Sequence, residues 1–178
     1  KHDGFNILIG LANLVVMGLG GFYLQQFLKF LSNHSIGLLY YLPTAASIII
    51  GFFIMDLIMY WWHRINHLIP FLWKFHRFHH TDEKLAASSS VRFHTVEILL
   101  SYVFKVPIFI LVGISAETVI VYGLVLVTVV TLHHSNIRIS ERVDMLLRTI
   151  LVSPRMHRIH HSVIKSETNS NYSSVLPY

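Results

Sequence analysis

The sequence predicts an all-α integral membrane protein, a helical bundle of about four transmembrane helices arranged as two hairpins. Three observations support this prediction. Of the 178 residues, 53% are hydrophobic and only 13% are charged, compared with about 25% charged residues in a soluble domain. Four apolar stretches each approach the roughly 20 residues that a helix needs to cross a bilayer. Only short polar links separate the first stretch from the second and the third from the fourth.

The four predicted spans are Phe5–Leu31, Ile36–Trp62, Val96–Ile114 and Ala116–Leu132. Only residues 32–35 separate the first two, and the turn between the last two involves little more than residues 113–117, so each pair forms a tight hairpin. The second span is long enough for its end to project beyond the bilayer. We expect a single membrane-embedded domain over residues 1–178. We also expect it to be a fragment, because it begins at Lys1 without Met and stops at Tyr178.

Two polar segments, residues 63–95 and 133–178, remain outside the spans. They hold 11 of the 14 Lys and Arg residues and 11 of the 13 histidines. Two hairpins place both segments on one side of the membrane, and the excess of positive charge indicates that this side is cytoplasmic. The net charge of +5 therefore reflects topology and contact with anionic lipid. No basic run is interleaved with aromatic residues, so we expect no nucleic-acid partner.

The histidines of these segments recur in a pattern that predicts a helical, histidine-rich metal site. His63 and His67 form an H-x3-H pair on the helix that continues from the second span, where positions i and i+4 share a face. Two H-x2-H-H triplets follow, and on a helix each triplet presents three imidazoles to one side. The triplets are His76, His79, His80 and His157, His160, His161.

His134, at the end of the last span, is a further predicted ligand. The total of nine imidazoles is too many for one ion, since a zinc site takes about four ligands. Two metals with four or five nitrogen ligands each fit the count. Imidazole suits iron, zinc, copper and nickel, so the ligand type leaves the metal open. The absence of cysteine excludes thiolate-ligated zinc, iron–sulfur clusters, disulfides and a cysteine nucleophile.

Five further residues are candidate ligands or supporting groups. His133 is a weaker candidate than His134, because adjacent helical residues point about 100° apart. His94 is either a ligand or an interfacial residue, and Asn171 is either a turn residue or a supporting donor. Asp56 and Tyr60 lie on the helical face that leads to His63. A carboxylate near the end of an apolar span needs a partner, and we expect Asp56 to accept a hydrogen bond from a ligating imidazole or from Arg64.

The three histidine boxes, with Asp56 and Tyr60 ahead of the first, resemble those of the membrane-bound fatty acid hydroxylase / sterol desaturase superfamily. The resemblance covers residues 56–178. Arg92-Phe93-His94 with Glu97, the His134 element and Asn171-Tyr172 are similar to further landmarks of the family. Thr95 stands where relatives often carry Pro, and Ser173 stands where Gly is usual. The boxes are most similar to those of the bacterial and alkylglycerol-monooxygenase-like branch, which favours a bacterial inner membrane over the endoplasmic reticulum.

The resemblance implies a non-haem di-iron oxidoreductase that uses O2 to hydroxylate or desaturate a fatty acyl, sterol or related lipid. It implies residues 63–95 and 133–178 as the catalytic segments. Because no haem, flavin or nucleotide motif is visible, we expect a separate electron-donor protein. Two alternatives stay open: the same fold with two zinc ions or without oxygenase activity, and a histidine-rich metal transporter. Transporters place their ligands near the bilayer midplane, whereas these histidines gather at one face.

Overall fold

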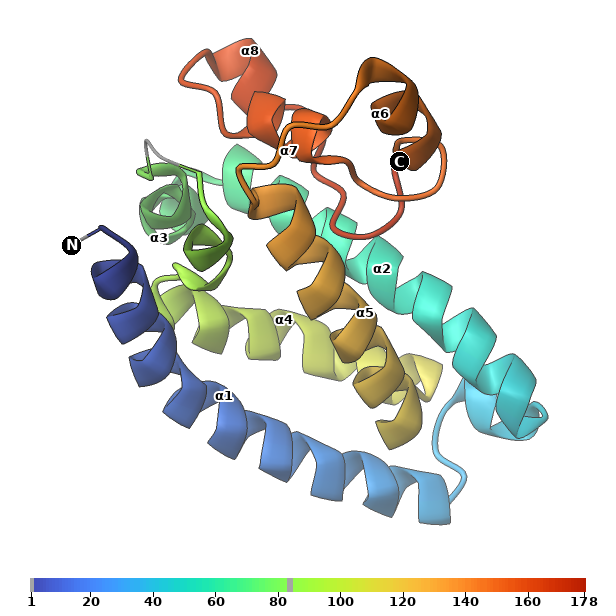
Figure 1. The fold of residues 1–178 in the computed structure, drawn as a ribbon. Coiled ribbons are helices and arrows are strands. Elements are labelled where there is room, and N and C mark those ends of the chain that lie inside the picture. The colour runs from blue at the N-terminus through green and yellow to red at the C-terminus, as the bar shows by residue number, and fades with distance from the viewer. Residues whose placement is uncertain (1, 83–84) are drawn as a thin grey trace.

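The computed structural model describes residues 2–82 and 85–178, and the predicted all-α fold is confirmed over them (Figure 1). No strand occurs in these residues. In chain order the helices are α1 (His2–Asn33), η1 (Leu38–Tyr41), α2 (Thr44–Leu68), α3 (Pro70–His80), η2 (Ala87–Val91), α4 (Thr95–Val112), α5 (Ala116–His134), α6 (Glu141–Leu147), α7 (Pro154–His160) and α8 (Lys165–Thr168).

Four of these helices, α1, α2, α4 and α5, are long and apolar enough to cross a membrane, as predicted. Their outer surfaces carry large apolar side chains that are more than half exposed, such as Leu8 and Leu14 on α1 and Val103 on α4. Such surfaces are typical of helices that face lipid. A helix also satisfies all of its backbone hydrogen bonds internally, as the bilayer core requires.

The second span begins later than the sequence predicts, at Thr44 rather than Ile36. Gly37 has a positive φ of 118°, a conformation that glycine adopts without steric cost. It also packs against the backbone of Gly113, where a Cβ atom would lie 2.3 Å from the Gly113 Cα. Pro43 then disfavours helical geometry in the preceding residue. The two hairpin turns therefore touch each other at glycines, and α2 starts only after Pro43.

The core lies among α1, α2, α4 and α5, where the buried side chains include Leu28, Met55, Phe109, Ile114 and Tyr122. The end of α2, the end of α5 and the starts of α1 and α4 all lie toward α3 and α7 (Figure 1). Both polar segments are therefore at the same end of the bundle, as the two predicted hairpins require.

Two buried asparagines fasten α1 to the loop that precedes α4. The Asn6 amide donates to Asp82 at 2.9 Å, and its oxygen accepts from the Arg92 guanidinium at 3.2 Å. About two turns further along α1, the Asn13 amide donates to the Phe93 carbonyl at 2.8 Å. These contacts hold residues 92 and 93 in place beside the histidines of α3.

Candidate metal centre

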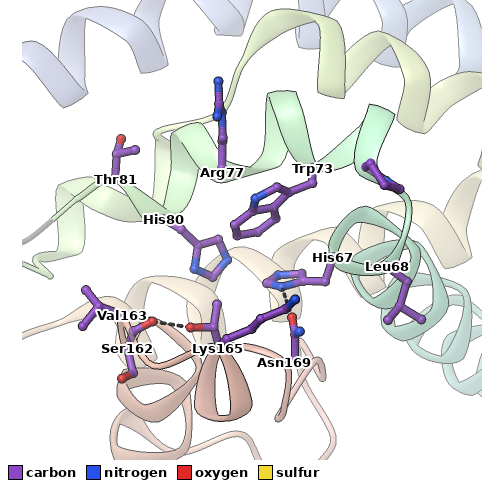
Figure 2. A pocket seen from close by; sticks show the side chains of 12 residues that line it. His67, Leu68, Trp73, Arg77, His80, Thr81, Ser162, Val163, Lys165 and Asn169 are labelled. Carbon is purple, nitrogen blue, oxygen red and sulfur yellow. Dashed lines mark hydrogen bonds between the residues drawn. The ribbon is translucent and has the colours of Figure 1, made fainter.

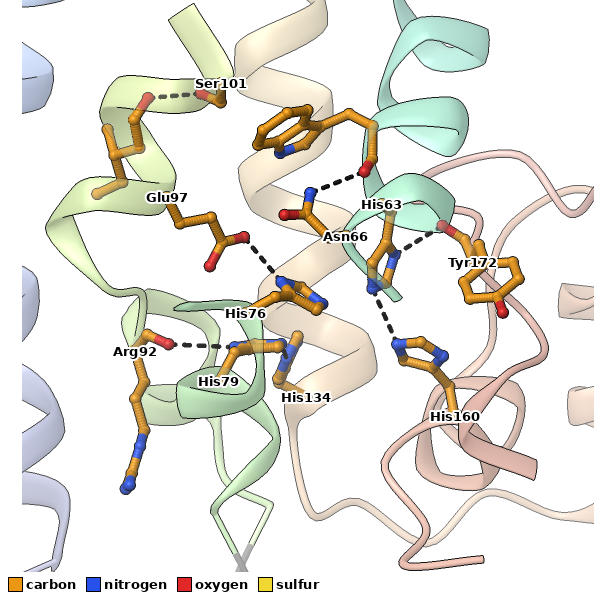
Figure 3. Close-up of polar contacts among 12 residues, drawn as sticks. His63, Asn66, His76, His79, Arg92, Glu97, Ser101, His134, His160 and Tyr172 are labelled. Carbon is orange, nitrogen blue, oxygen red and sulfur yellow. Dashed lines mark hydrogen bonds and ion pairs between the residues drawn. The ribbon is translucent and has the colours of Figure 1, made fainter. Parts of the chain in front are cut away.

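Five histidines from three helices converge where α2 leaves the bundle. Each offers one ring nitrogen, and the five nitrogens lie within 4.8 Å of one another. We call this set the five-histidine group; Figure 3 shows several of its members. It consists of His63 and His67 from α2, His76 and His80 from α3, and His160 from α7.

Four other histidines form a second set by the same criterion. This four-histidine group consists of His79 from α3, His134 from α5, and His157 and His161 from α7 and its C-terminal cap. The nine predicted ligands therefore divide into five and four, and each set brings histidines of α3 together with histidines of α7, which lies more than 70 residues later in the sequence.

The sequence analysis predicted that each H-x2-H-H triplet presents three imidazoles to one side. In the structure each triplet is instead split between the two groups. His76 and His80, at i and i+4, belong to the five-histidine group, whereas His79 reaches the four-histidine group. On α7 the roles are exchanged: His157 and His161 serve the four-histidine group, and His160 crosses to the other. Consecutive helical residues point about 100° apart, so the middle histidine of each triplet faces a different neighbouring helix.

Hydrogen bonds at Nδ1 fix the orientation of most of these rings. His76 Nδ1 lies 2.7 Å from a carboxylate oxygen of Glu97, which is itself buried. The His67 Nδ1 contacts the side-chain oxygen of Asn169 at 3.3 Å. The others donate from Nδ1 to backbone carbonyls: His63 to Tyr172 at 2.8 Å, His79 to Arg92 at 3.3 Å, His134 to Val130 at 2.8 Å and His160 to Ser170 at 2.7 Å. Such partners hold a ligating imidazole in one tautomer.

Because a carbonyl oxygen can only accept, the Nδ1 atoms of these rings carry the hydrogen, and the neutral rings have bare Nε2 atoms. The Nε2 atoms of His63 and His160 nevertheless lie 2.9 Å apart, and those of His79 and His134 lie 3.1 Å apart (Figure 3). Two facing lone pairs repel each other unless a cation lies between them. For metal–nitrogen bonds of about 2.0–2.1 Å, two ligands at right angles would be about 2.9 Å apart.

Five histidines outside the spans are held in the neutral form that metal binding requires. Burial lowers the pKa of His79, His80, His157 and His160 well below its usual value, and neighbouring histidines lower it further. The same causes lower the pKa of His161 to about 2. A protonated imidazole has no lone pair to offer a metal, so the crowding of these rings favours cation binding.

Several buried ring nitrogens have no hydrogen-bond partner among the residues that the structure describes. They are His67 Nε2, His76 Nε2, both nitrogens of His80, His133 Nδ1, His157 Nδ1 and both nitrogens of His161. A buried polar atom without a partner is costly, and in this set nearly all belong to the two groups. The orphaned nitrogens, the facing Nε2 atoms and the all-imidazole donor set together fit two metal ions.

Two of the remaining candidate ligands lie outside the groups. The His133 ring stacks on His157, with centroids 3.9 Å apart, and supports that ring from behind. His94 is the N-cap of α4, where its Nδ1 accepts a hydrogen bond from the Val96 backbone at 3.1 Å. Since this nitrogen is used for capping, the structure gives His94 a local structural role.

Asp56 has different partners from those predicted. It is fully buried and accepts from the Tyr122 hydroxyl at 2.8 Å and from the Leu176 backbone at 3.0 Å. It therefore ties the C-terminal segment to α2 rather than contacting an imidazole or Arg64.

The last two candidates, Tyr60 and Asn171, also belong to neither histidine group. Arg64 pairs with the Tyr60 hydroxyl at 3.1 Å, and the Tyr60 ring meets the edge of Tyr172. Asn171 adopts a positive φ of 49° and donates to the Met156 carbonyl at 3.3 Å. It is therefore the turn residue of the two roles considered for it.

Sequence reasoning missed Asn169 and treated Glu97 only as a landmark. Glu97 carried a usable signal, because a carboxylate in the first turn of an apolar span needs a buried partner. Asn169 lies in a Ser- and Asn-rich stretch that resembles any polar loop. The carbonyl groups of Arg92, Ser170 and Tyr172 carry no side-chain signal at all, since every residue has one.

A cavity of about 620 Å³ opens beside the five-histidine group, between α3 and the segment that joins α7 to α8 (Figure 2). His67 and His80 line it, together with Trp73 and Asn169. Its size is typical of small-molecule sites. None of the four-histidine group lines this cavity, so the two groups differ in access.

The sequence also matches known proteins. The profile described as fatty acid hydroxylase matches residues 48–178. An ornithine lipid hydroxylase of Rhizobium tropici is 30% identical over 136 residues, which cover 75% of this chain and 40% of that protein. An alkylglycerol monooxygenase of Homo sapiens is 27% identical over 122 residues, 68% of this chain and 26% of that protein. No solved structure gives a significant match.

The chain thus spans well under half the length of these relatives. The region matched by the family profile nevertheless begins within α2 and includes both histidine groups and the cavity. The resemblance read from the three histidine boxes is confirmed, and the chain belongs to the fatty acid hydroxylase family.

Proposed function

We propose that this chain is the metal-binding catalytic part of an O2-dependent lipid hydroxylase, with two iron ions held by the nine histidines. The facing Nε2 atoms carry this proposal, since at least one pair occurs in each group. The five-histidine group would hold one ion and the four-histidine group the other. The bound metals would supply the activation of O2 and the oxidation of an unactivated C–H bond. Membership of the family and the hydroxylase and monooxygenase names of the relatives support a lipid substrate.

The chain's own residues would set the geometry and exclude water. Glu97 and the carbonyl groups at residues 92, 170 and 172 orient the rings, so little rearrangement is needed when metal binds. Burial lowers the pKa of His79 and His160 and so keeps their imidazoles neutral. The cavity beside His67 and His80 gives the five-histidine group a path to substrate.

The setting of the reaction is part of the same proposal. Residues 1–178 would act as one membrane-embedded domain, with the histidine groups on the cytoplasmic side and a separate electron-donor protein docking there. The concentration of Lys and Arg in residues 63–95 and 133–178 supports this orientation. The bacterial source of one relative supports a bacterial inner membrane.

Isotopically labelled dioxygen tests the proposed reaction. Purified iron-loaded protein is incubated with a bacterial lipid extract, a chemical reductant and labelled O2, and the lipids are analysed by mass spectrometry. We expect one labelled oxygen atom in a lipid product. His34→Ala is a matched control, because His34 is an exposed histidine outside both groups; it should leave the product unchanged. Oxygen from water in the product, or no product from iron-loaded protein, would contradict the proposal.

A further inference from the structure

We propose that the cavity beside the five-histidine group binds the anionic headgroup of a lipid, with Lys165 as the residue that recognises its charge. This inference rests on the proposed function and adds a substrate class to it.

The charge of the cavity is one-sided. Within the described part of the chain, its lining includes Lys165 and Arg77 and no aspartate or glutamate. Among the residues that the structure describes, Lys165 has no carboxylate within ion-pair distance. In Figure 2 its side chain extends across the cavity toward His67 and Asn169, whereas the Arg77 guanidinium points away on the far side of α3. Lys165 is therefore the cation available to a bound group.

The neighbouring polar atoms favour the same kind of ligand. Asn169 turns its oxygen to the Nδ1 of His67, which leaves its amide nitrogen as a donor on the cavity side. With a lysine ammonium and an amide N–H, the cavity offers donors close together, and no carboxylate of the described residues 2–82 and 85–178 lines it. Phosphate and carboxylate are the groups that accept hydrogen bonds from such a pair most strongly.

The rim of the cavity indicates that this anion belongs to a lipid. Leu68 and Val163 line the cavity, with exposed fractions of 56% and 101%. Ile69 and Ile164 lie next to them in the sequence, Phe71 follows three residues after Leu68, and all three are also exposed. Exposed apolar side chains around a polar cavity are typical of a surface that meets the membrane. The rim includes Leu68, the last residue of α2, so the opening lies at one end of a helix that is long and apolar enough to cross a membrane.

The test is lipid retention in nanodiscs of phosphatidylcholine with a minority of phosphatidylglycerol, counted by native mass spectrometry. We expect the wild-type protein to retain phosphatidylglycerol in preference to phosphatidylcholine. Lys165→Gln should reduce this preference about tenfold, the effect of losing roughly 1.4 kcal/mol from one charged contact. Lys165→Arg should keep most of it. Lys74→Gln is the matched control, since Lys74 is an exposed lysine of α3 that does not line the cavity.

Three results would overturn the inference. They are an unchanged preference in Lys165→Gln, an equal loss in Lys74→Gln, and displacement of the lipid by inorganic phosphate at equal concentration, which would indicate a site for free anions. Metal content is measured on the same samples. Loss of the lipid preference in protein that holds two metals would refute only this inference, whereas retained preference without metal would refute only the proposed function.

Discussion

The five-histidine group borders a cavity at the end of α2, whereas the four-histidine group lies among α3, α5 and α7 away from that cavity. The first is oriented by side chains as well as carbonyl groups, through Glu97 and Asn169. In the second, hydrogen bonds to backbone carbonyl groups orient the rings of His79 and His134. We infer that the two metals would share one chemistry but not one role, with substrate approaching the five-histidine group.

Removing one histidine from each group tests this division with the largest expected effect. We expect both His160→Ala and His157→Ala to abolish product formation while the protein still inserts into membranes. His160→Ala leaves four ligands in its group and His157→Ala leaves three, so the second variant should lose its ion more completely. Activity is measured by lipid product and metal content by elemental analysis. Normal turnover by His160→Ala would remove the third histidine box from the site.

Acid tests what the two groups have in common. The pKa of His161 is lowered to about 2 in the folded protein, compared with about 6.5 in an unfolded chain. The unfolded state therefore takes up a proton below pH 6.5 that the folded state does not, and stability falls as the pH falls. At pH 5 the loss is about 2 kcal/mol for each such imidazole.

Thermal unfolding of metal-stripped protein in detergent at pH 7 and pH 5 measures this loss. We expect a clearly lower midpoint at pH 5, and a smaller difference after metal is restored. Equal midpoints for the metal-stripped protein would show that these imidazoles are not neutral and buried.

Replacing Glu97 should weaken one group and spare the other. Glu97→Gln keeps an oxygen near His76 Nδ1 but removes its charge. Loss of such a partner typically lowers metal affinity by roughly 10- to 100-fold. We expect a loss of this order for the five-histidine group. Titration with a competing chelator measures both ions. Glu117→Gln, at an exposed position in the first turn of α5, is the control. Equal weakening of both ions by Glu97→Gln would contradict the division into two groups.

Asp56→Asn should have the smallest effect. The asparagine has only one oxygen for the Tyr122 hydroxyl and the Leu176 backbone, so we expect a loss of about 1–3 kcal/mol in unfolding free energy. The C-terminal segment also carries the carbonyl that orients His63, so the five-histidine group should bind metal slightly less tightly. Asp144→Asn, a buried carboxylate of α6 paired with Arg148, should lower stability without changing metal affinity. Equal effects on metal binding would refute the role of Asp56.

The sequence was sufficient to predict the helical class, the four spans and the shared end of the polar segments, because apolar length and charge bias follow directly from the bilayer. The late start of α2 was not predicted, although Gly37 and Pro43 carried the signal. Hydrophobicity averaged over a long apolar stretch hides the effect of two turn-forming residues.

The candidate site was predicted as a set of residues but not as an arrangement. The spacing of a triplet shows which face of a helix each histidine occupies, but it does not show which helix packs opposite that face. The crossing of His79 and His160 between the groups therefore required the tertiary structure. The roles of Asp56 and His94 depended on Tyr122, Leu176 and the start of α4 in the same way.

The metal content of the purified protein tests most directly whether the nine histidines form two metal sites. The protein is expressed in iron-supplemented medium, purified in detergent without added chelator, and analysed for iron and zinc together with protein concentration. We expect about two ions per chain, because each ion would have about four or five ligands. We also expect both ions to be iron. Two zinc ions would leave the two sites standing and contradict the choice of iron. The absence of any stoichiometric metal would contradict the account as a whole.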